Sequence, residues 1–125
     1  MKDIQIGLQL FSLREETVKD FTGTLEKVAN LGYKGVEFAG YGGLSAKELK
    51  SVLEHLGLKA ASSHVALPLL ENELDQVIEF QQVIGNRHIA CPFLPPERRT
   101  KESYYELINI LNDVGRKCYE AGITL

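Results

Sequence analysis

Four times along the chain, a short run of apolar and β-branched residues is followed by a longer stretch with apolar positions at helical spacing. The short runs cover residues 4–10, 34–38, 59–65 and 87–91, and residues 123–125 resemble the opening of a fifth. This repeat predicts strands that alternate with helices at the spacing of βα units. Because helical crossovers connect parallel neighbouring strands, the pattern predicts one parallel sheet.

The helical stretches also carry start and stop signals, and each precedes a glycine: Gly32, Gly57, Gly85 and Gly122. Asp20 is the predicted cap of the first helix and Thr100 that of the last. The second helix has a capping box in Ser45-Ala-Lys-Glu48, with Leu44 and Leu49 spaced as a hydrophobic staple. The third stretch places Leu70, Leu74, Val77 and Ile78 on one face, and the fourth does the same with Leu107, Ile108, Leu111 and Cys118.

Two α/β architectures fit this order of elements, an open doubly wound sheet and a (β/α)8 TIM barrel. The first predicted strand helps to choose between them. One of its faces is apolar, while Gln5, Gly7, Gln9 and Phe11 make the other face mixed. A barrel wall packs only its outer face on helices, so the pattern favours a TIM barrel, represented here by a (β/α)4 half-barrel plus the start of a fifth strand.

Composition narrows the class of protein further. The chain has 125 residues, ordinary globular composition and a formal net charge of −3, which is unfavourable for nucleic-acid binding. Cys91 and Cys118 are far apart and lie in no C-x-x-C motif, so we expect reduced thiols in a cytoplasmic protein. The first 13 residues lack the features of a signal peptide, and no apolar run is long enough to span a membrane.

Two polar residues near the ends of predicted strands are the leading candidates for chemistry. Glu37 lies between Val36 and Phe38, where a carboxylate could act as a general acid or base or accept hydroxyl hydrogen bonds; the alternative is an ion pair with a neighbouring strand. His64 follows small residues that would let a substrate or metal approach; the alternative is a core histidine that donates to a backbone carbonyl. The carboxyl ends of barrel strands are where such enzymes place their active sites.

The loops after the strands contain weaker candidates. Residues 40–43, Gly-Tyr-Gly-Gly, precede a helix and could hold an anion, although a surface loop is the favoured interpretation. Arg14, Arg98 and Arg99 could bind a phosphate or carboxylate, or could be solvated surface charges. The aromatic residues Phe11, Tyr41 and Phe93 could line a pocket for a polyol or could cap the core.

Three segments carry a resemblance to a known family: IGLQLFSLR at 6–14, TLEKVANLGYKGVEF at 24–38 and SSHV at 62–65. They resemble the sugar phosphate isomerase/epimerase family of the xylose isomerase-like TIM-barrel superfamily, and residues 1–125 match the N-terminal half of a family member. The resemblance implies a barrel of about 250 residues that isomerises or epimerises a sugar, a sugar phosphate or an inosose-type polyol by proton transfer next to a carbonyl.

The resemblance also implies residue roles and partners. Gln9, Phe11, Glu37 and His64 match positions that line the substrate pocket, and the family uses a divalent metal (Mn, Mg, Zn or Co) whose ligands come from later strands. We therefore expect no metal ligand and no catalytic residue in these 125 residues, and no activity of the chain alone. The expected partner is a small sugar, without nucleic acid or membrane. Self-association or a C-terminal half should complete the barrel, and the alternative is a non-catalytic half-barrel or ligand-binding βα module that self-assembles.

Overall fold

A computed structural model describes residues 4–125 and contains one parallel sheet of four strands in the order β1-β2-β3-β4. The strands are β1 (Gly7–Gln9), β2 (Gly35–Phe38), β3 (Lys59–His64) and β4 (Ile89–Ala90). An isolated parallel bridge between His88 and Thr124 continues the sheet where a fifth strand is predicted to open. Because the strand order follows the chain without reversal, the sheet is that of a barrel wall and not of a doubly wound domain.

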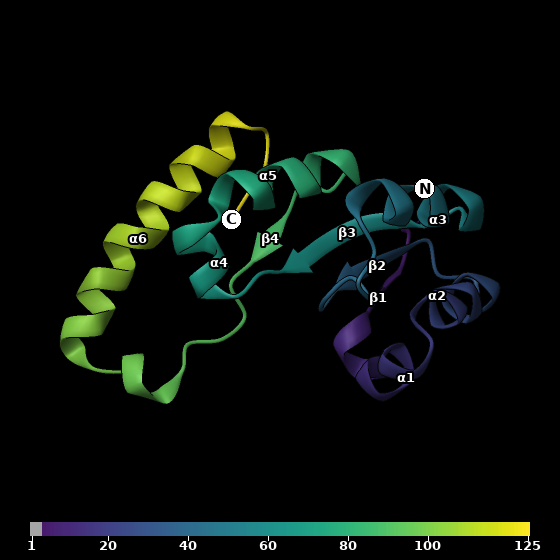
Figure 1. Cartoon of the computed structure of the whole chain (residues 1–125), viewed down its shortest axis with the longest axis horizontal. Helices are drawn as coiled ribbons and strands as arrows, with labels where there is room; N and C mark the ends of the chain where they lie inside the picture. The colour runs from purple at the N-terminus through teal and green to yellow at the C-terminus, as the bar shows by residue number, and fades with distance from the viewer. Residues whose placement is uncertain (1–3) are drawn as a thin grey trace.

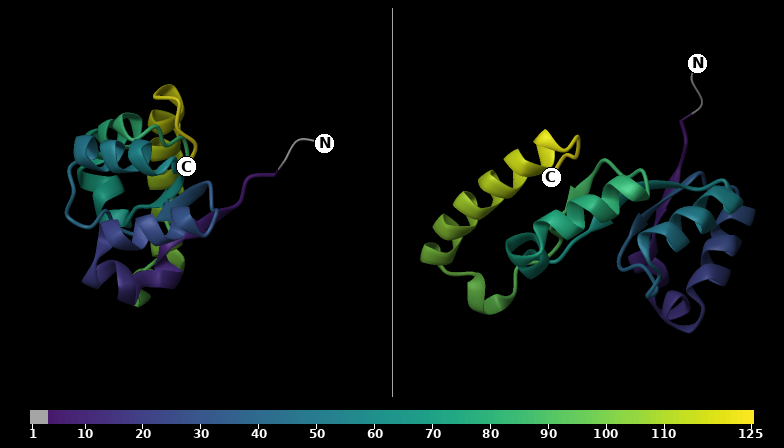
Figure 2. Two further views of the ribbon diagram at one scale, coloured as in Figure 1. Left: turned by 90° about the vertical axis from the view of Figure 1, so that its right-hand side faces the viewer. Right: turned by 45° about the horizontal axis from the view of Figure 1, so that its top comes forward.

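Helices form an arc along the outer side of this curved sheet (Figures 1 and 2). They are α1 (Arg14–Lys19), α2 (Phe21–Asn30), α3 (Ala46–Leu56), α4 (Leu67–Asn72), α5 (Leu74–Val83) and α6 (Lys101–Glu120), with 3₁₀ turns η1 (Leu10–Leu13) and η2 (Pro96–Arg98). Right-handed crossovers between consecutive parallel strands place all the connecting helices on one face. The other face, which would be the interior of a barrel, is left to the polar and small residues of the strands.

The predicted capping residues form the expected hydrogen bonds at the helix ends. Asp20 accepts a hydrogen bond from the Gly23 amide at 2.9 Å, and Thr100 accepts one from the Ser103 amide at 3.1 Å. Ser45 and Glu48 form both halves of the capping box. Gly57 then leaves α3 with a φ of 64°, a left-handed conformation that favours glycine.

Several predicted boundaries are wrong. The predicted strand 4–10 shortens to Gly7–Gln9, because β2 begins only at Gly35 and Leu10 already belongs to η1. Ile6 is consequently 66% exposed instead of packed on helices. Strand 87–91 shortens to Ile89–Ala90, and the proline at 92 has no N–H to extend the ladder.

Two helix predictions also need correction. The single helix expected before Gly85 is two helices, α4 and α5, which are separated at Glu73. The Asn72 side chain donates to the Pro68 carbonyl at 2.8 Å, a local bond that competes with continuation of the helix. In α6, Ile108 is 55% exposed, and the buried positions of that helix are Val114 and Cys118.

The core consists of two clusters on the helix side of the sheet. The first joins β1, β2 and β3 to α2 and α3, and Leu25, Val36, Phe38 and Leu49 are fully buried in it. The second joins β4 and Val65, the residue after β3, to α4 and α6 through residues such as Leu70 and Cys118. These clusters anchor the outward side chains of the strands and so fix which residues face the opposite side.

Both cysteines are free thiols, as expected. Cys118 is buried and Cys91 is partly buried. Burial raises the pKa of both thiols above the ordinary value, which makes them poor nucleophiles. Among residues 4–125, no helix is long and apolar enough to cross a membrane.

Candidate functional site

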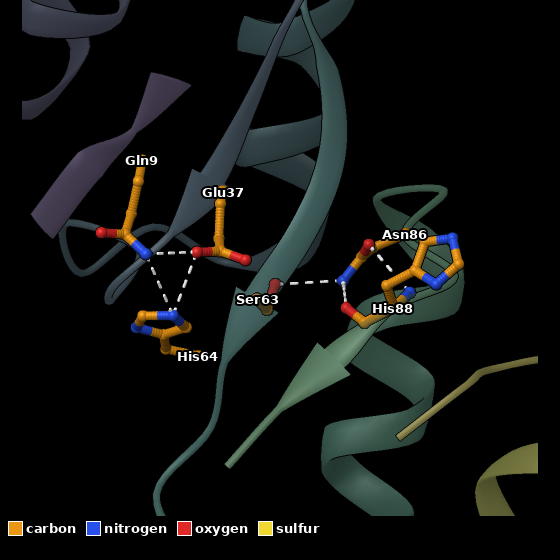
Figure 3. Close-up of polar contacts among 6 residues, drawn as sticks. All are labelled: Gln9, Glu37, Ser63, His64, Asn86 and His88. Atoms are coloured by element: carbon orange, nitrogen blue, oxygen red, sulfur yellow. Dashed lines mark hydrogen bonds and ion pairs between the residues drawn. The ribbon is translucent and has the colours of Figure 1, made fainter. Parts of the chain in front are cut away.

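Three polar side chains from neighbouring strands meet at the carboxyl end of the sheet (Figure 3). Gln9 Nε2 of β1 donates to Glu37 Oε1 of β2 at 2.5 Å, and His64 Nε2 of β3 lies 3.0 Å from the same oxygen. Gln9 Nε2 and His64 Nε2 are 3.4 Å apart. We call Gln9, Glu37 and His64 the polar triangle.

One carboxylate oxygen serves as the shared acceptor of this triangle. Because His64 Nε2 lies at hydrogen-bond distance from a carboxylate, a favourable contact requires that Nε2 carries a proton. Gln9 Nε2 is also a donor. The 3.4 Å distance between Gln9 Nε2 and His64 Nε2 is therefore a contact between two donors, both of which bind the same acceptor, Glu37 Oε1. In the neutral ring, this tautomer leaves His64 Nδ1 as an acceptor for another group.

Electrostatics keeps Glu37 ionised. The hydrogen bond from Gln9 is the largest cause that lowers the pKa of Glu37, burial opposes it, and Ser62 and His64 lower the pKa further. The side chains of Glu37 and His64 are 26% and 20% exposed, so the pair is accessible from the open face. A carboxylate with a lowered pKa is a weak base near neutral pH and is better suited to accept hydrogen bonds than to transfer protons.

The structure thus gives Glu37 a hydrogen-bonding partner on a neighbouring strand, His64, and this contact is an ion pair only when the imidazole is protonated. His64 does not lie in the core. The resemblance placed Gln9, Glu37 and His64 in one pocket, and the structure brings all three together. Their substrate contacts remain predictions.

A β-bulge in β3 is what turns His64 toward Glu37. The β2–β3 register shifts between Val36 and Glu37: Val36 pairs with Ala60, but Glu37 pairs with Ser62. A regular ladder would pair Glu37 with Ala61, and the strand would then point His64 toward the helices. With the extra residue, His64 lies on the same face as Glu37, an example of a bulge that re-aims a side chain.

Beside the polar triangle lies a largely apolar cleft of about 710 Å³. Its walls come from the loops after β1, β2, β3 and β4 and include Phe11, Ala39, Leu67 and Phe93, while His64 contributes a polar edge. Tyr41 is not part of it. Its ring packs against Phe80 at a centroid distance of 4.3 Å, so Tyr41 caps the core.

The three candidate arginines are already engaged. Arg98 donates to both carboxylate oxygens of Glu71 at 2.9 Å. Arg14 Nη1 donates to the Phe11 carbonyl and Arg99 Nε to the Leu94 carbonyl. Within residues 4–125, no lysine or arginine lines the cleft.

The glycine-rich loop 40–43 is poorly suited to bind an anion. Tyr41 ties the loop to the core, and the amide of Ser45 at the start of α3 already donates to Glu48 at 2.8 Å. The negative charge of Glu48 at this helix terminus further disfavours a bound anion. The geometry therefore favours the surface-loop interpretation.

Sequence reasoning missed Ser62 and a set of buried polar residues behind His64. Ser62 has no distinguishing signal in the sequence, because its contact with Glu37 depends on the bulge. Gln81 does have a signal. It interrupts the apolar stripe of Val77 and Ile78 at helical spacing, where a polar residue needs a buried partner.

No protein-family model matches the chain, and no curated protein matches it. Solved structures do. A sugar phosphate isomerase/epimerase from Parabacteroides distasonis superposes with a TM-score of 0.78 at 22% identity, over 98% of this chain and 50% of its own. The chain has the fold of half of a TIM barrel.

Two further structures support this half-barrel fold. An AP endonuclease, family 2, from Brucella melitensis has a TM-score of 0.75 at 17% identity, over 96% of this chain and 53% of its own. A xylose isomerase domain protein from Alicyclobacillus acidocaldarius has a TM-score of 0.62 at 13% identity, over 97% and 48%. The half-barrel spans about half the length of each protein, and the predicted fold class is confirmed.

Proposed function

We propose that this half-barrel contributes the hydroxyl-binding wall of a sugar isomerase or epimerase. The observation that carries the proposal is the polar triangle at the carboxyl edge of the sheet, directly beside an apolar cleft. Barrel enzymes place their chemistry at this edge. The similarity to solved isomerase and epimerase structures agrees with it at the level of fold.

The two parts of the site match the two faces of a polyol. Glu37 and His64 offer a charged acceptor and a ring nitrogen to hydroxyl groups, and Phe11 and Phe93 offer apolar surface to the C–H face of the same molecule. The described lining has no cation, which supports a neutral sugar or inosose-type polyol at this wall. A phosphate of a sugar phosphate would need binding groups other than these.

The proposed reaction is proton transfer at the carbon next to a carbonyl. Within it, Glu37 accepts a hydrogen bond from a substrate hydroxyl and stays ionised, while Gln9 and His64 hold its carboxylate in place. The low pKa of Glu37 supports an orienting role over a proton-shuttling one. We expect the acid and base that move the proton to come from other strands of the complete barrel.

The residues described here do not fit a divalent metal site. No group of three or more His, Cys, Asp and Glu side chains gathers within residues 4–125, and Glu37 and His64 are bonded to each other. A structural or catalytic zinc site uses three or four protein ligands. The Mn, Mg, Zn or Co ion that the resemblance implies remains a prediction.

The similarity to an AP endonuclease raises DNA as another substrate class. The net charge of −3 and the absence of lysine and arginine around the described cleft favour a small neutral ligand over a phosphate backbone.

Binding can be tested on the chain itself by NMR. We expect fructose, but much less fructose 6-phosphate, to perturb the ring resonances of His64 and the amides around Phe93. Glu37→Gln should abolish the perturbation, whereas Glu106→Gln, at an exposed position on α6, should leave it intact. Equal chemical-shift perturbation in the two variants would contradict the proposal. Saturable fructose binding with the same affinity in Glu37→Gln as in the wild type would contradict it as well. The chain alone should give no ketose or inosose turnover with or without Mn²⁺.

An uncovered edge favours a second candidate, a non-catalytic half-barrel that self-assembles. β1 is an edge strand whose flanking residues Ile4 and Ile6 are 91% and 66% exposed. Such an edge promotes association with another chain. Sedimentation of the wild type and of Ile6→Lys would test this: a dimer that dissociates in the variant, without sugar binding in either, would favour self-assembly.

A further inference from the structure

Behind the polar triangle, on the helix side of the sheet, Ser63, Gln81 and Asn86 form a buried polar cluster that we call the latch. Their exposures are 0%, 1% and 2%. Ser63 Oγ donates to Gln81 Oε1 at 2.8 Å, and Asn86 Nδ2 donates to the same oxygen at 2.8 Å. The latch therefore connects β3 to α5 and to the turn before β4.

The latch also reaches the two segments on either side of β3. Gln81 Nε2 donates to the Tyr41 hydroxyl at 2.8 Å, in the loop that follows β2. Asn86 Nδ2 donates to the His88 carbonyl at 2.7 Å, and the His88 amide donates to Asn86 Oδ1 at 3.2 Å. Figure 3 shows Ser63 pointing toward Asn86 and His64 pointing the other way, toward Glu37.

The opposite directions of Ser63 and His64 depend on the β3 bulge. Ala60 packs on the first core cluster. Ala61 faces the open side, where its Cβ lies 3.7 Å from the position that a Cβ on Gly35 would occupy. Ser62 also faces the open side, because it is the register partner of Glu37 in the β2–β3 ladder. Two successive residues thus share one face, so Ser63 is directed to the helices and His64 to Glu37.

In a ladder without the bulge, all residues after Ala61 would exchange faces. Ser63 would leave the latch for the open face, and His64 would enter the helix layer. Gln81 Oε1 would then lose the hydrogen bond that Ser63 Oγ donates to it, and Asn86 Nδ2 would lose its 3.1 Å bond to the same hydroxyl. Such losses are unfavourable in an apolar surrounding. The latch bonds are therefore compatible only with the register that brings His64 to Glu37.

We propose that Gln81 is a positioning residue, which holds β3 in its bulged register through Ser63 and thereby aims His64 at Glu37. Gln81 touches neither Glu37 nor His64, and it lies on the far side of the sheet from the cleft. The inference does not rest on the proposed function, because it concerns the geometry of the polar triangle whatever that triangle binds.

The pKa of Glu37, followed by ¹³C NMR of its carboxyl carbon, reports this geometry. In the wild type, His64→Phe should raise that pKa, because the contact with His64 is removed. Gln81→Met should raise it as well, since slippage of β3 withdraws both His64 and Ser62. In the Gln81→Met background, a further His64→Phe change should then have no effect.

A matched control separates positioning from general loss of stability. Thr24 of α2 also has a buried hydroxyl, and its Oγ1 donates to the carbonyl of Asp20, the N-cap of that helix. Thr24→Val should destabilise the fold but leave the pKa of Glu37 unchanged. An unchanged pKa in Gln81→Met, or an equal rise in Thr24→Val, would overturn the proposal.

A second pair of variants decides the matter if Gln81→Met does not fold. Ser63→Ala removes the hydroxyl that Gln81 accepts from, whereas Ser63→Thr retains it. The pKa of Glu37 should rise in Ser63→Ala and return toward the wild-type value in Ser63→Thr. Equal values in the two variants would overturn the proposal.

Discussion

The hydrogen bond from Gln9 to Glu37 should make the stability of this chain depend on pH in a defined way. Gln9→Leu removes the donor while keeping side-chain bulk. A hydrogen bond to a charged group contributes about 1.5–3 kcal/mol when sheltered and a neutral one about 0.5–1.5 kcal/mol. Gln9 is exposed and Glu37 is only partly buried, so we expect a loss of about 1 kcal/mol at pH 7.

The sign of the pH dependence follows from the direction of the pKa shift. Gln9 lowers the pKa of Glu37 in the folded chain. Such a carboxylate contributes stability that is fully present above its unfolded pKa of about 4.3 and is lost as the pH falls through the folded pKa. The difference between wild type and Gln9→Leu should therefore be full at pH 7 and should decrease as the pH falls below about 4.3.

Urea unfolding at pH 7, 5.5, 4 and 3 measures this difference directly. Gln82→Leu is the matched control, because Gln82 is also exposed and donates to a neutral acceptor, the Ala121 carbonyl, at 3.2 Å. Its effect should not vary with pH. A Gln9→Leu effect that is equal at pH 7 and pH 3, or absent at pH 7, would refute the assigned role of Gln9.

Three further predictions concern the core, a helix cap and the thiols. Leu25→Ala should reduce the free energy of unfolding by about 2–5 kcal/mol, because Leu25 is fully buried in the first cluster; a loss below 1 kcal/mol in urea would contradict that packing. Ser45→Ala should cost about 1 kcal/mol in the same assay, since it removes the capping box of α3, and an unchanged midpoint would argue against it. At pH 8, Ellman's reagent should label Cys91 slowly and Cys118 only on unfolding, because burial raises the pKa of both thiols. Rapid labelling of Cys118 in the folded chain would contradict this prediction.

Local signals predicted the parts of the fold that depend on local chemistry. The caps at Asp20, Ser45 and Thr100 act through side chains within three residues of the backbone they bind, so the sequence determines them. The predicted start of β1 was wrong, because a strand extends only as far as its partner strand, and β2 begins only at Gly35. The apolar pattern likewise did not predict the break between α4 and α5, because one apolar stripe runs through both helices.

By itself, the sequence determined the alternation of strands and helices, the parallel sheet and the polar character of the strand ends, because periodicity and capping are local properties. It also singled out Glu37 and His64 as polar residues at strand ends. Only the tertiary structure decided that Glu37 and His64 meet. Their contact depends on one extra residue in β3 and on the buried side-chain amide of Gln81, which lies 17 positions after His64 in the chain. A strand's faces exchange with every single-residue shift, and the bonds that select the shift join residues far apart in sequence.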